Sequence, residues 1–197
     1  MLVIASWNIN SIRIRLNSIS DWIEKRCPDI ILFQEIKCQT NEFPYTFFTD
    51  KGYENIVEGQ KARNGVAIVI KKDLLRKKEQ KINNKINFNN QSRFMCYYLP
   101  LLDIYLCNIY VPNGNPADDV EKYNYKVDFF LALKKFLYPF IINEKKIIIG
   151  GDFNVIENKK DVKDFELWKN DALGKLQIRK SFRELISLGY LNVCRFF

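Results

Sequence analysis

The chain has 197 residues, of which 47% are hydrophobic and 14% aromatic, so it can form one globular domain with a real core, and a disordered chain is excluded. It carries 31 Lys and Arg against 23 Asp and Glu, a formal net charge of +8, and it contains no histidine. The absence of imidazole excludes a Ser-His-Asp or Cys-His triad, a histidine zinc helix and a histidine-ligated haem. Acid-base or metal chemistry must therefore use carboxylates, amides, phenols or lysines.

Short apolar runs rich in β-branched residues alternate with amphipathic stretches along the chain. The predicted strands are residues 2–7, 29–34, 65–70, 93–99, 103–109 and 146–150. The predicted helices are residues 12–23, 119–137 and 179–188. No internal repeat or flexible linker divides the sequence, so we expect a single α/β domain over residues 1–197.

Basic residues are concentrated between Lys71 and Gln91. They are Lys71, Lys72, Arg76, Lys77, Lys78, Lys81 and Lys85. We interpret this segment as a mobile surface loop, although it could also touch a phosphate backbone. The net positive charge favours a polyanionic partner such as nucleic acid, but a solvated basic surface explains charge alone equally well.

The cysteines and the N-terminus indicate where the protein resides. Five scattered cysteines without a Cys-x-x-Cys pair predict reduced, mostly buried thiols rather than disulfides or a zinc site. They are Cys27, Cys38, Cys96, Cys107 and Cys194. Residues 1–7 do not resemble a signal peptide, and the apolar runs are too short to span a membrane. We therefore expect a soluble cytoplasmic protein.

Polar side chains follow four of the predicted strands where each strand ends. In chain order they are Asn8 with Asn10, Glu35, Tyr110, and Asp152 with Asn154. Because functional residues of α/β proteins gather in the loops at one end of the strands, we expect this set to converge. Taken singly, each residue is explained as well by a turn, a helix cap or an amphipathic core tyrosine.

Four motifs carry these residues. They are Ser6-Trp7-Asn8-Ile9-Asn10-Ser11-Ile12-Arg13, Phe33-Gln34-Glu35-Ile36-Lys37, Asn108-Ile109-Tyr110-Val111-Pro112-Asn113-Gly114 and Gly151-Asp152-Phe153-Asn154-Val155. In order and spacing they resemble the motifs of the exonuclease III family, the bacterial AP endonucleases of the endonuclease/exonuclease/phosphatase superfamily. Supporting similarities lie at Arg63, at Lys122-Tyr123-x-Tyr125-Lys126 and around Trp168, so the resemblance covers nearly the whole chain.

The resemblance implies a fold and an activity. The fold would be a two-sheet β-sandwich flanked by helices in four layers, lacking its last strands. The activity would be that of a Mg²⁺-dependent DNA phosphodiesterase of base excision repair, an AP endonuclease and 3′–5′ exonuclease, with Mn²⁺ as an alternative ion. The partner would be double-stranded DNA with abasic sites or 3′ ends, bound by a monomer.

The resemblance also implies residue roles. Glu35 would be the main metal ligand, with Asn8 beside it. Asp152 would orient and deprotonate the attacking water and, with Asn154, would also lie at the metal. Asn154 would donate to a phosphate oxygen, and Tyr110 would contact the phosphate. The implied DNA-binding residues are Asn10, Arg63, Lys122, Tyr123, Tyr125 and Lys126. On the helical pattern alone, however, Tyr123 is also explained as a core residue and the lysines as a solvated face.

Members of the family continue into further segments that this sequence lacks. Those segments supply an aspartate and an Asp-His pair around the scissile phosphate. We therefore expect a truncated homologue with weak or no activity, unless a separate chain supplies the remainder. The alternatives are a catalytically inactive DNA-binding remnant and a superfamily phosphodiesterase that acts on lipid head groups or sugar phosphates.

Overall fold

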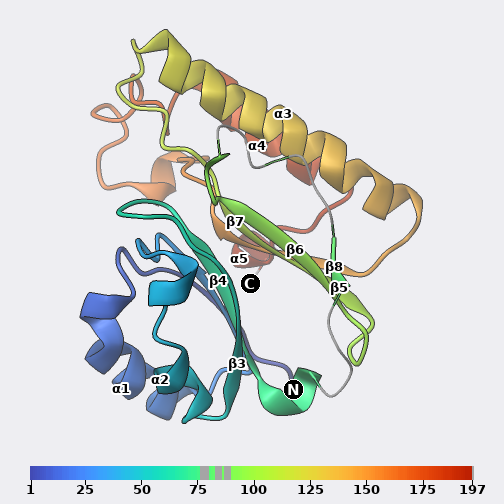
Figure 1. The fold of residues 1–197 in the computed structure, drawn as a ribbon. Helices are drawn as coiled ribbons and strands as arrows, with labels where there is room; N and C mark the ends of the chain where they lie inside the picture. Colours follow the sequence, from blue (N-terminus) through green and yellow to red (C-terminus); the bar gives the residue numbers. More distant parts are fainter. Residues whose placement is uncertain (76–79, 83–85, 87–89, 197) are drawn as a thin grey trace. The chain divides into compact units, whose positions relative to one another are not determined.

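The computed structural model describes residues 1–75, 80–82, 86 and 90–196, and Figure 1 shows its ribbon. The chain divides into two units. The first unit comprises Met1–Tyr110 and Lys146–Asp152, and the second comprises Val111–Lys145 and Phe153–Phe197. The prediction of a single domain over the whole chain stays a prediction.

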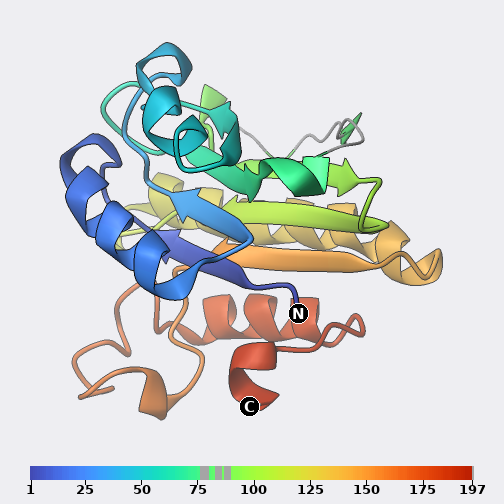
Figure 2. The ribbon, with the colours of Figure 1, turned by 90° about the horizontal axis from the view of Figure 1, so that it is seen from below.

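The first unit contains two four-stranded sheets. The first sheet has the order β1 (Ile4–Asn8), β2 (Ile30–Gln34), β4 (Val66–Lys71), β3 (Tyr53–Glu58). The second has the order β5 (Gln80–Lys81), β6 (Phe94–Leu99), β7 (Ile104–Tyr110), β8 (Ile147–Asp152). Among the strand pairs of the described residues, only β1–β2 and β7–β8 are parallel. In Figure 2 strands β6, β7 and β8 of the second sheet lie in a row.

Side chains alternate between the two faces of the first sheet, as the strand period of two requires. Leu32 and Ile68 pack in one core cluster with Met95 and Leu106 of the second sheet, so the two sheets face each other. On the opposite face the alternate residues of β2 and β4 pack against α1 (Leu16–Arg26) and α2 (Tyr45–Thr49). The two-sheet sandwich with flanking helices that the resemblance implied is thus confirmed in this unit.

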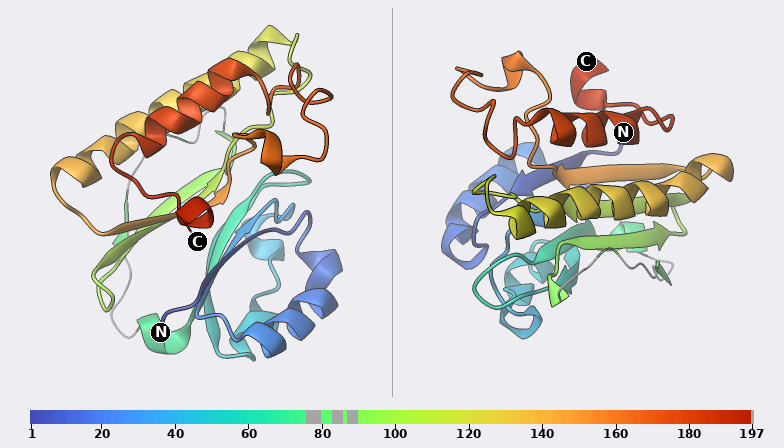
Figure 3. Two further views of the ribbon diagram at one scale, coloured as in Figure 1. Left: turned by 180° about the vertical axis from the view of Figure 1, so that it is seen from behind. Right: turned by 90° about the horizontal axis from the view of Figure 1, so that it is seen from above.

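The second unit contains the long helix α3 (Val120–Ile142), the helix α4 (Leu176–Ile186) and a short α5 (Val193–Phe196). Asp119 caps α3, because its carboxylate accepts the backbone N–H of Lys122. Helices α3 and α4 run side by side (Figure 3), and Tyr190 Oη donates to Leu137 O of α3 at 2.9 Å. The buried face of α3 has helical spacing and includes one charged residue, Lys126.

Most predicted elements are confirmed within a few residues. The structure adds α2, β3 and α5, because α2 and α5 are short and the sequence of β3 mixes polar and apolar residues without strict alternation. The segment 71–91 is not a loop throughout. Lys71 closes β4, a 3₁₀ helix spans Lys72–Leu75, and Lys81 lies in β5. Arg76, Lys77, Lys78 and Lys85 lie outside the described residues.

The prediction of free, mostly buried thiols agrees with the structure. All five thiols are free, with Cys38, Cys96 and Cys107 buried and Cys27 and Cys194 exposed. Burial raises the pKa of the Cys38 thiol to about 11, so this side chain is protonated at neutral pH. In the described part of the chain, no helix has both the length and the apolar character needed to cross a membrane.

Candidate active site

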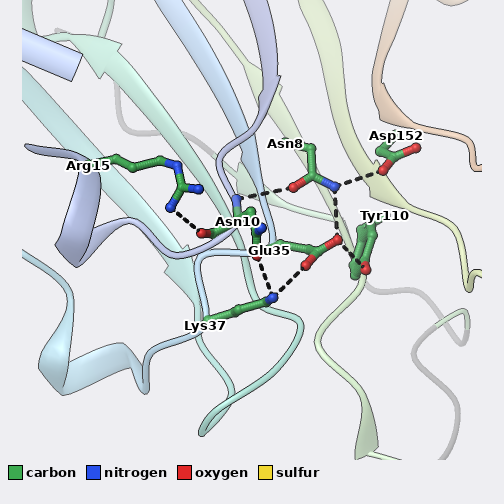
Figure 4. A network of polar contacts seen from close by, with 7 residues as sticks. All are labelled: Asn8, Asn10, Arg15, Glu35, Lys37, Tyr110 and Asp152. Carbon is green, nitrogen blue, oxygen red and sulfur yellow. Dashed lines mark hydrogen bonds and ion pairs between the residues drawn. The ribbon is translucent and has the colours of Figure 1, made fainter. Parts of the chain in front are cut away.

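Four of the predicted site residues come together in the first unit (Figure 4). Asn8 is the last residue of β1, Glu35 follows β2, and Tyr110 and Asp152 end β7 and β8. Parallel pairing sets Asn8 opposite Gln34 and Tyr110 opposite Asp152, which brings the four strand ends to one edge of the sandwich. We call Asn8, Glu35, Tyr110 and Asp152 the carboxylate rim.

The Asn8 amide connects the two carboxylates of the rim. Its Nδ2 donates to Glu35 Oε1 at 2.9 Å and to Asp152 Oδ2 at 2.8 Å. The amide is oriented in turn, because Asn8 Oδ1 accepts the backbone N–H of Asn10 at 3.2 Å. Two carboxylates on separate sheets are thereby held next to each other.

Glu35 has three side-chain donors. Tyr110 Oη donates to Oε1 at 2.6 Å, alongside Asn8, and Lys37 Nζ lies 3.0 Å from Oε2. Partial burial by itself raises the pKa of the Glu35 carboxyl, but the hydrogen bonds from Asn8, Tyr110 and Lys37 outweigh it and hold the pKa below its usual value. Glu35 is therefore an anion at neutral pH.

Tyr110 is a donor to Glu35 rather than an anion. Its side chain is largely buried, and the guanidinium of Arg93 lies 4.6 Å from the ring centroid. Burial and the hydrogen bond to Glu35 both raise the pKa of the Tyr110 hydroxyl far above its usual value. The phenol thus stays protonated and orients Glu35, while its implied contact with a phosphate remains a prediction.

The backbone around Glu35 adopts uncommon conformations. The φ angles of Glu35 (+52°), Lys37 (+50°) and Asn10 (+46°) lie in the left-handed region, which costs a non-glycine residue on the order of 1–2 kcal/mol. Backbone hydrogen bonds hold the loop on both sides: Ser11 N donates to Glu35 O at 2.8 Å, and Lys37 N donates to Asn64 O at 3.0 Å. Strain retained in this way is typical of functional sites.

A buried amide pair connects the two sheets directly behind the rim. Gln34 Nε2 donates to Asn108 Oδ1 at 2.7 Å, and Asn108 Nδ2 donates to Phe33 O and Ala67 O, each at 2.9 Å. Gln34 is 1% exposed and Asn108 is 0% exposed. Gln34 directly precedes Glu35, and Asn108 lies two residues before Tyr110. The buried amide pair therefore fixes β2 and β7 relative to each other, next to the hydrogen bond between Tyr110 and Glu35.

The predicted DNA-binding residues have different environments. In the first unit, Arg63 is exposed, and Asn10 Oδ1 accepts Lys37 Nζ at 2.5 Å. In the second unit, Lys122 is exposed and paired with Asp119 at 2.8 Å. Tyr123 is half-buried, with the Lys175 ammonium 4.8 Å from its ring centroid, and Tyr125 is half-buried as well.

Lys126 does not lie on the solvated face of α3 that the sequence left open as an alternative. It is 0% exposed, and its ammonium donates to Asn113 O at 2.8 Å and to Asn154 O at 2.6 Å. The Asn154 side chain donates from Nδ2 to Val111 O at 2.8 Å. This placement gives Lys126 internal partners where the resemblance implied a phosphate.

Several residues at the rim were absent from the predicted site. Lys37 stood in one of the motifs, two residues after Glu35. A lysine so close in sequence to a carboxylate was the signal for the ion pair that the two residues form. Gln34 and Asn108 also stood in the motifs, where polar residues inside apolar strands are the available signal. Nothing in the sequence pointed to Arg93.

The donor set of the rim fits a hard divalent cation. Glu35 and Asp152 supply carboxylate oxygens, and Mg²⁺ prefers oxygen ligands. Within residues 1–75, 80–82, 86 and 90–196, no cluster of three or more His, Cys, Asp and Glu could hold a metal on its own. A magnesium site needs only one or two carboxylates when water and a substrate phosphate complete the coordination, so the rim is sufficient for Mg²⁺.

Comparison with known proteins shows which family the chain resembles. The profile of the Endonuclease/Exonuclease/phosphatase family matches residues 5–193. The chain is 32% identical over 165 residues to the exodeoxyribonuclease III of Haemophilus influenzae, covering 80% of this chain and 59% of that protein. It is 28% identical over 205 residues to the DNA-(apurinic or apyrimidinic site) endonuclease of Dictyostelium discoideum, covering 98% and 53%.

Solved structures give the same result. An AP endonuclease from Archaeoglobus fulgidus has a TM-score of 0.88 and 30% sequence identity, and the match covers 100% of this chain and 74% of that one. The 3′ phosphatase NExo from Neisseria, bound to a product DNA hairpin, has a TM-score of 0.88 and 27% identity with the same coverage. The chain spans between half and two thirds of the length of the curated relatives. With a profile match over nearly its whole length and the same fold, the chain belongs to the Endonuclease/Exonuclease/phosphatase family.

Proposed function

We propose that this chain is a metal-dependent DNA phosphodiesterase that cleaves the backbone of duplex DNA at abasic sites and removes groups from 3′ ends. The observation that carries the proposal is the carboxylate rim, in which one amide holds Glu35 and Asp152 together. The names of the similar proteins, an exodeoxyribonuclease, AP endonucleases and a 3′ phosphatase, support DNA as the substrate.

Glu35 and Asn8 would hold the metal, Mg²⁺ or Mn²⁺, together with oxygens of the substrate. The ion, when bound, polarises the phosphoryl oxygen and stabilises the leaving 3′ oxygen. Glu35 is suited to this task because its three donors keep it ionised and fixed in orientation. Tyr110 would contribute by holding Glu35, as its hydroxyl already does in this structure.

Asp152 would act as the base that orients and deprotonates the attacking water. A carboxylate at this position needs only hydrogen-bond reach to the water. Asn8 donates to one of its oxygens, Oδ2, and so fixes the plane of the carboxyl group for that role. Water attack at phosphorus would break the bond to the 3′ oxygen, with the water proton passing to Asp152. Asn154, two residues further along the chain, would donate to a phosphate oxygen.

Exposed basic residues would contact the DNA backbone. Arg63 and Lys122 are exposed, and each phosphate that they neutralise releases counterions, which makes binding sensitive to salt. An abasic nucleotide is the cheapest to turn out of the duplex because it has no base to unstack.

The test uses the purified chain and a duplex with one abasic site, with Mg²⁺ or with a chelator. Cleavage should require the metal and should fall by roughly 10²–10³ in Asp152→Asn, which keeps the size of the side chain but removes the base. Asp21→Asn, an exposed carboxylate on α1, is the matched control and should cleave like the wild type. Metal-independent cleavage, or equal cleavage by Asp152→Asn, would contradict the proposal, as would faster hydrolysis of a small soluble phosphodiester.

The second candidate is a protein that binds DNA without cleaving it. The net charge of +8 and the absence of any histidine favour this reading. It predicts salt-dependent binding of the duplex by a folded chain, with no product in Mg²⁺ or Mn²⁺. Cleavage that needs both the metal and Asp152 would exclude it.

A further inference from the structure

Lys126 is an unusual member of the buried face of α3. It is 0% exposed, and its neighbours on this face are Phe129, Phe130, Leu133 and Leu137. An isolated ammonium is expensive to bury, so it must be compensated by hydrogen bonds. Its Nζ donates to two backbone carbonyls, Asn113 O at 2.8 Å and Asn154 O at 2.6 Å.

The two carbonyls belong to the segments that directly continue the strand ends of the rim. Asn113 lies three residues after Tyr110, and Asn154 lies two residues after Asp152, while Tyr110 and Asp152 are register partners in β7 and β8. The Asn154 side chain closes the arrangement, because its Nδ2 donates to Val111 O at 2.8 Å. We call Val111, Asn113, Lys126 and Asn154 the Lys126 junction.

Gly114 shows how closely the chain approaches Lys126. Its φ is +80°, and a Cβ built on it would lie 2.7 Å from Lys126 Cδ and 3.2 Å from Lys126 Cβ. Only glycine therefore lets this loop lie against the lysine stem in the observed conformation. Asn154 itself has a φ of +47°, a conformation that asparagine tolerates and that the bond from Lys126 helps to hold.

We propose that Lys126 is a positioning residue, whose ammonium holds the Asn154 backbone and so directs the Asn154 side chain, instead of binding a DNA phosphate. This inference rests on the proposed function only for its effect on cleavage. Losing the ammonium frees two carbonyls and loosens Asn154 without removing a charge from the DNA-binding surface. Loss of a phosphate-binding lysine, in contrast, removes a charge from the DNA-binding surface and leaves the two carbonyls and Asn154 in place.

The test compares the variants Lys126→Met and Lys122→Met. Lys122 lies one turn earlier on α3 and is exposed. Methionine keeps the length and packing of the lysine stem but cannot donate. For Lys126→Met we expect kcat to fall by roughly 10–100-fold with KM nearly unchanged, as for a misplaced group. The slope of log Kd against log salt should stay at the wild-type value. For Lys122→Met that slope should become shallower by about 1.

A second readout does not depend on cleavage. In Lys126→Met, amide hydrogen exchange should rise in residues 111–115 and 153–156 while β4 stays protected. If the wild type fails to cleave DNA, the proposed function fails, whereas the exchange and salt measurements still decide the role of Lys126. Unchanged exchange, or a salt slope in Lys126→Met that falls as it does in Lys122→Met, would overturn the inference.

Gly114→Ala covers the case in which Lys126→Met does not fold. The added methyl would push against the lysine stem, so exchange should rise in the same two segments. Gly52→Ala is the matched control, because Gly52 has a similar φ of +85° but nothing within 4 Å of its added Cβ. It carries the same backbone cost without touching the junction. Equal exchange in residues 111–115 and 153–156 for the two alanine variants would contradict the role of Lys126.

Discussion

The carboxylate rim and the Lys126 junction both hold polar groups in fixed positions, but they bond them to different partners. In the rim, side chains bond to side chains, as when Asn8 donates to Glu35 and Asp152. In the junction, side chains bond to backbone carbonyls, as when Lys126 donates to Asn113 and Asn154. Side-chain networks present charges that can do chemistry, whereas bonds to the backbone fix where a loop lies. Substitutions in the rim should therefore remove a charged group that the reaction needs, and substitutions in the junction should displace the loop that carries Asn154.

The strongest test of the rim is Glu35→Gln. The substitution keeps the shape of the side chain but removes the negative charge that would hold the metal and that pairs with Lys37. We expect cleavage to fall by roughly 10²–10³ and not to recover at high Mg²⁺. Circular dichroism should show an unchanged fold. Wild-type activity in the variant would show that Glu35 is not needed to hold the metal.

The rim was predictable because strand patterns place residues accurately. β1 ends at Asn8 and β8 ends at Asp152. Parallel pairing of β1 with β2 and of β7 with β8 places the carboxyl ends of the paired strands at the same edge of their sheet. The hydrogen bonds among these side chains were not predictable, because they depend on the register between two sheets. The same limit concealed the buried pair of Gln34 and Asn108.

The junction was less predictable, although its signal was present. Lys126 lies four, seven and eleven residues before Phe130, Leu133 and Leu137, which is the spacing of one helical face. Lysine usually lies in solvent, so this spacing alone does not predict that Lys126 is buried. Burial also requires hydrogen-bond partners, and these lie far away in the sequence. Those partners, the carbonyls of Asn113 and Asn154, have no sequence signature.

The buried amide pair gives the next largest expected effect, this time on stability. Asn108→Leu preserves the approximate volume but removes the bonds to Phe33 O and Ala67 O and takes from the Gln34 amide its shortest hydrogen bond, the one to Asn108 Oδ1 at 2.7 Å. We expect a loss of about 2–4 kcal/mol in the free energy of unfolding, measured with urea. Ser6→Ala removes only the longer contact of Gln34, at 3.2 Å, and should cost less than about 1 kcal/mol. Equal losses would mean that the pair does not hold the sheets together.

The smallest expected effect concerns the opposite end of β2, where Asp29 is a carboxylate with a lysine partner but no place in the rim. Its oxygens accept Lys71 Nζ at 2.8 Å and the Val3 backbone N–H at 2.7 Å. The hydrogen bond from Lys71, followed by that from Val3, holds the pKa of the Asp29 carboxyl below its ordinary value despite some desolvation. Asp29, which directly precedes β2, is thus a structural counterpart to Glu35, which directly follows it.

A pKa that is lower in the folded chain than in the unfolded chain stabilises the fold above the unfolded value, about 3.9, and the gain disappears as the pH falls through the folded value. Since both partners are partly exposed, Asp29→Asn should cost only about 1 kcal/mol at pH 7. The difference between wild type and variant should stay level down to about pH 5 and shrink below about pH 4. DNA cleavage at pH 7 should be unaffected, in contrast to Glu35→Gln. A stability difference that grows on acidification would show that Asp29 does not act as a paired carboxylate, and a loss of cleavage would extend the chemistry beyond the rim.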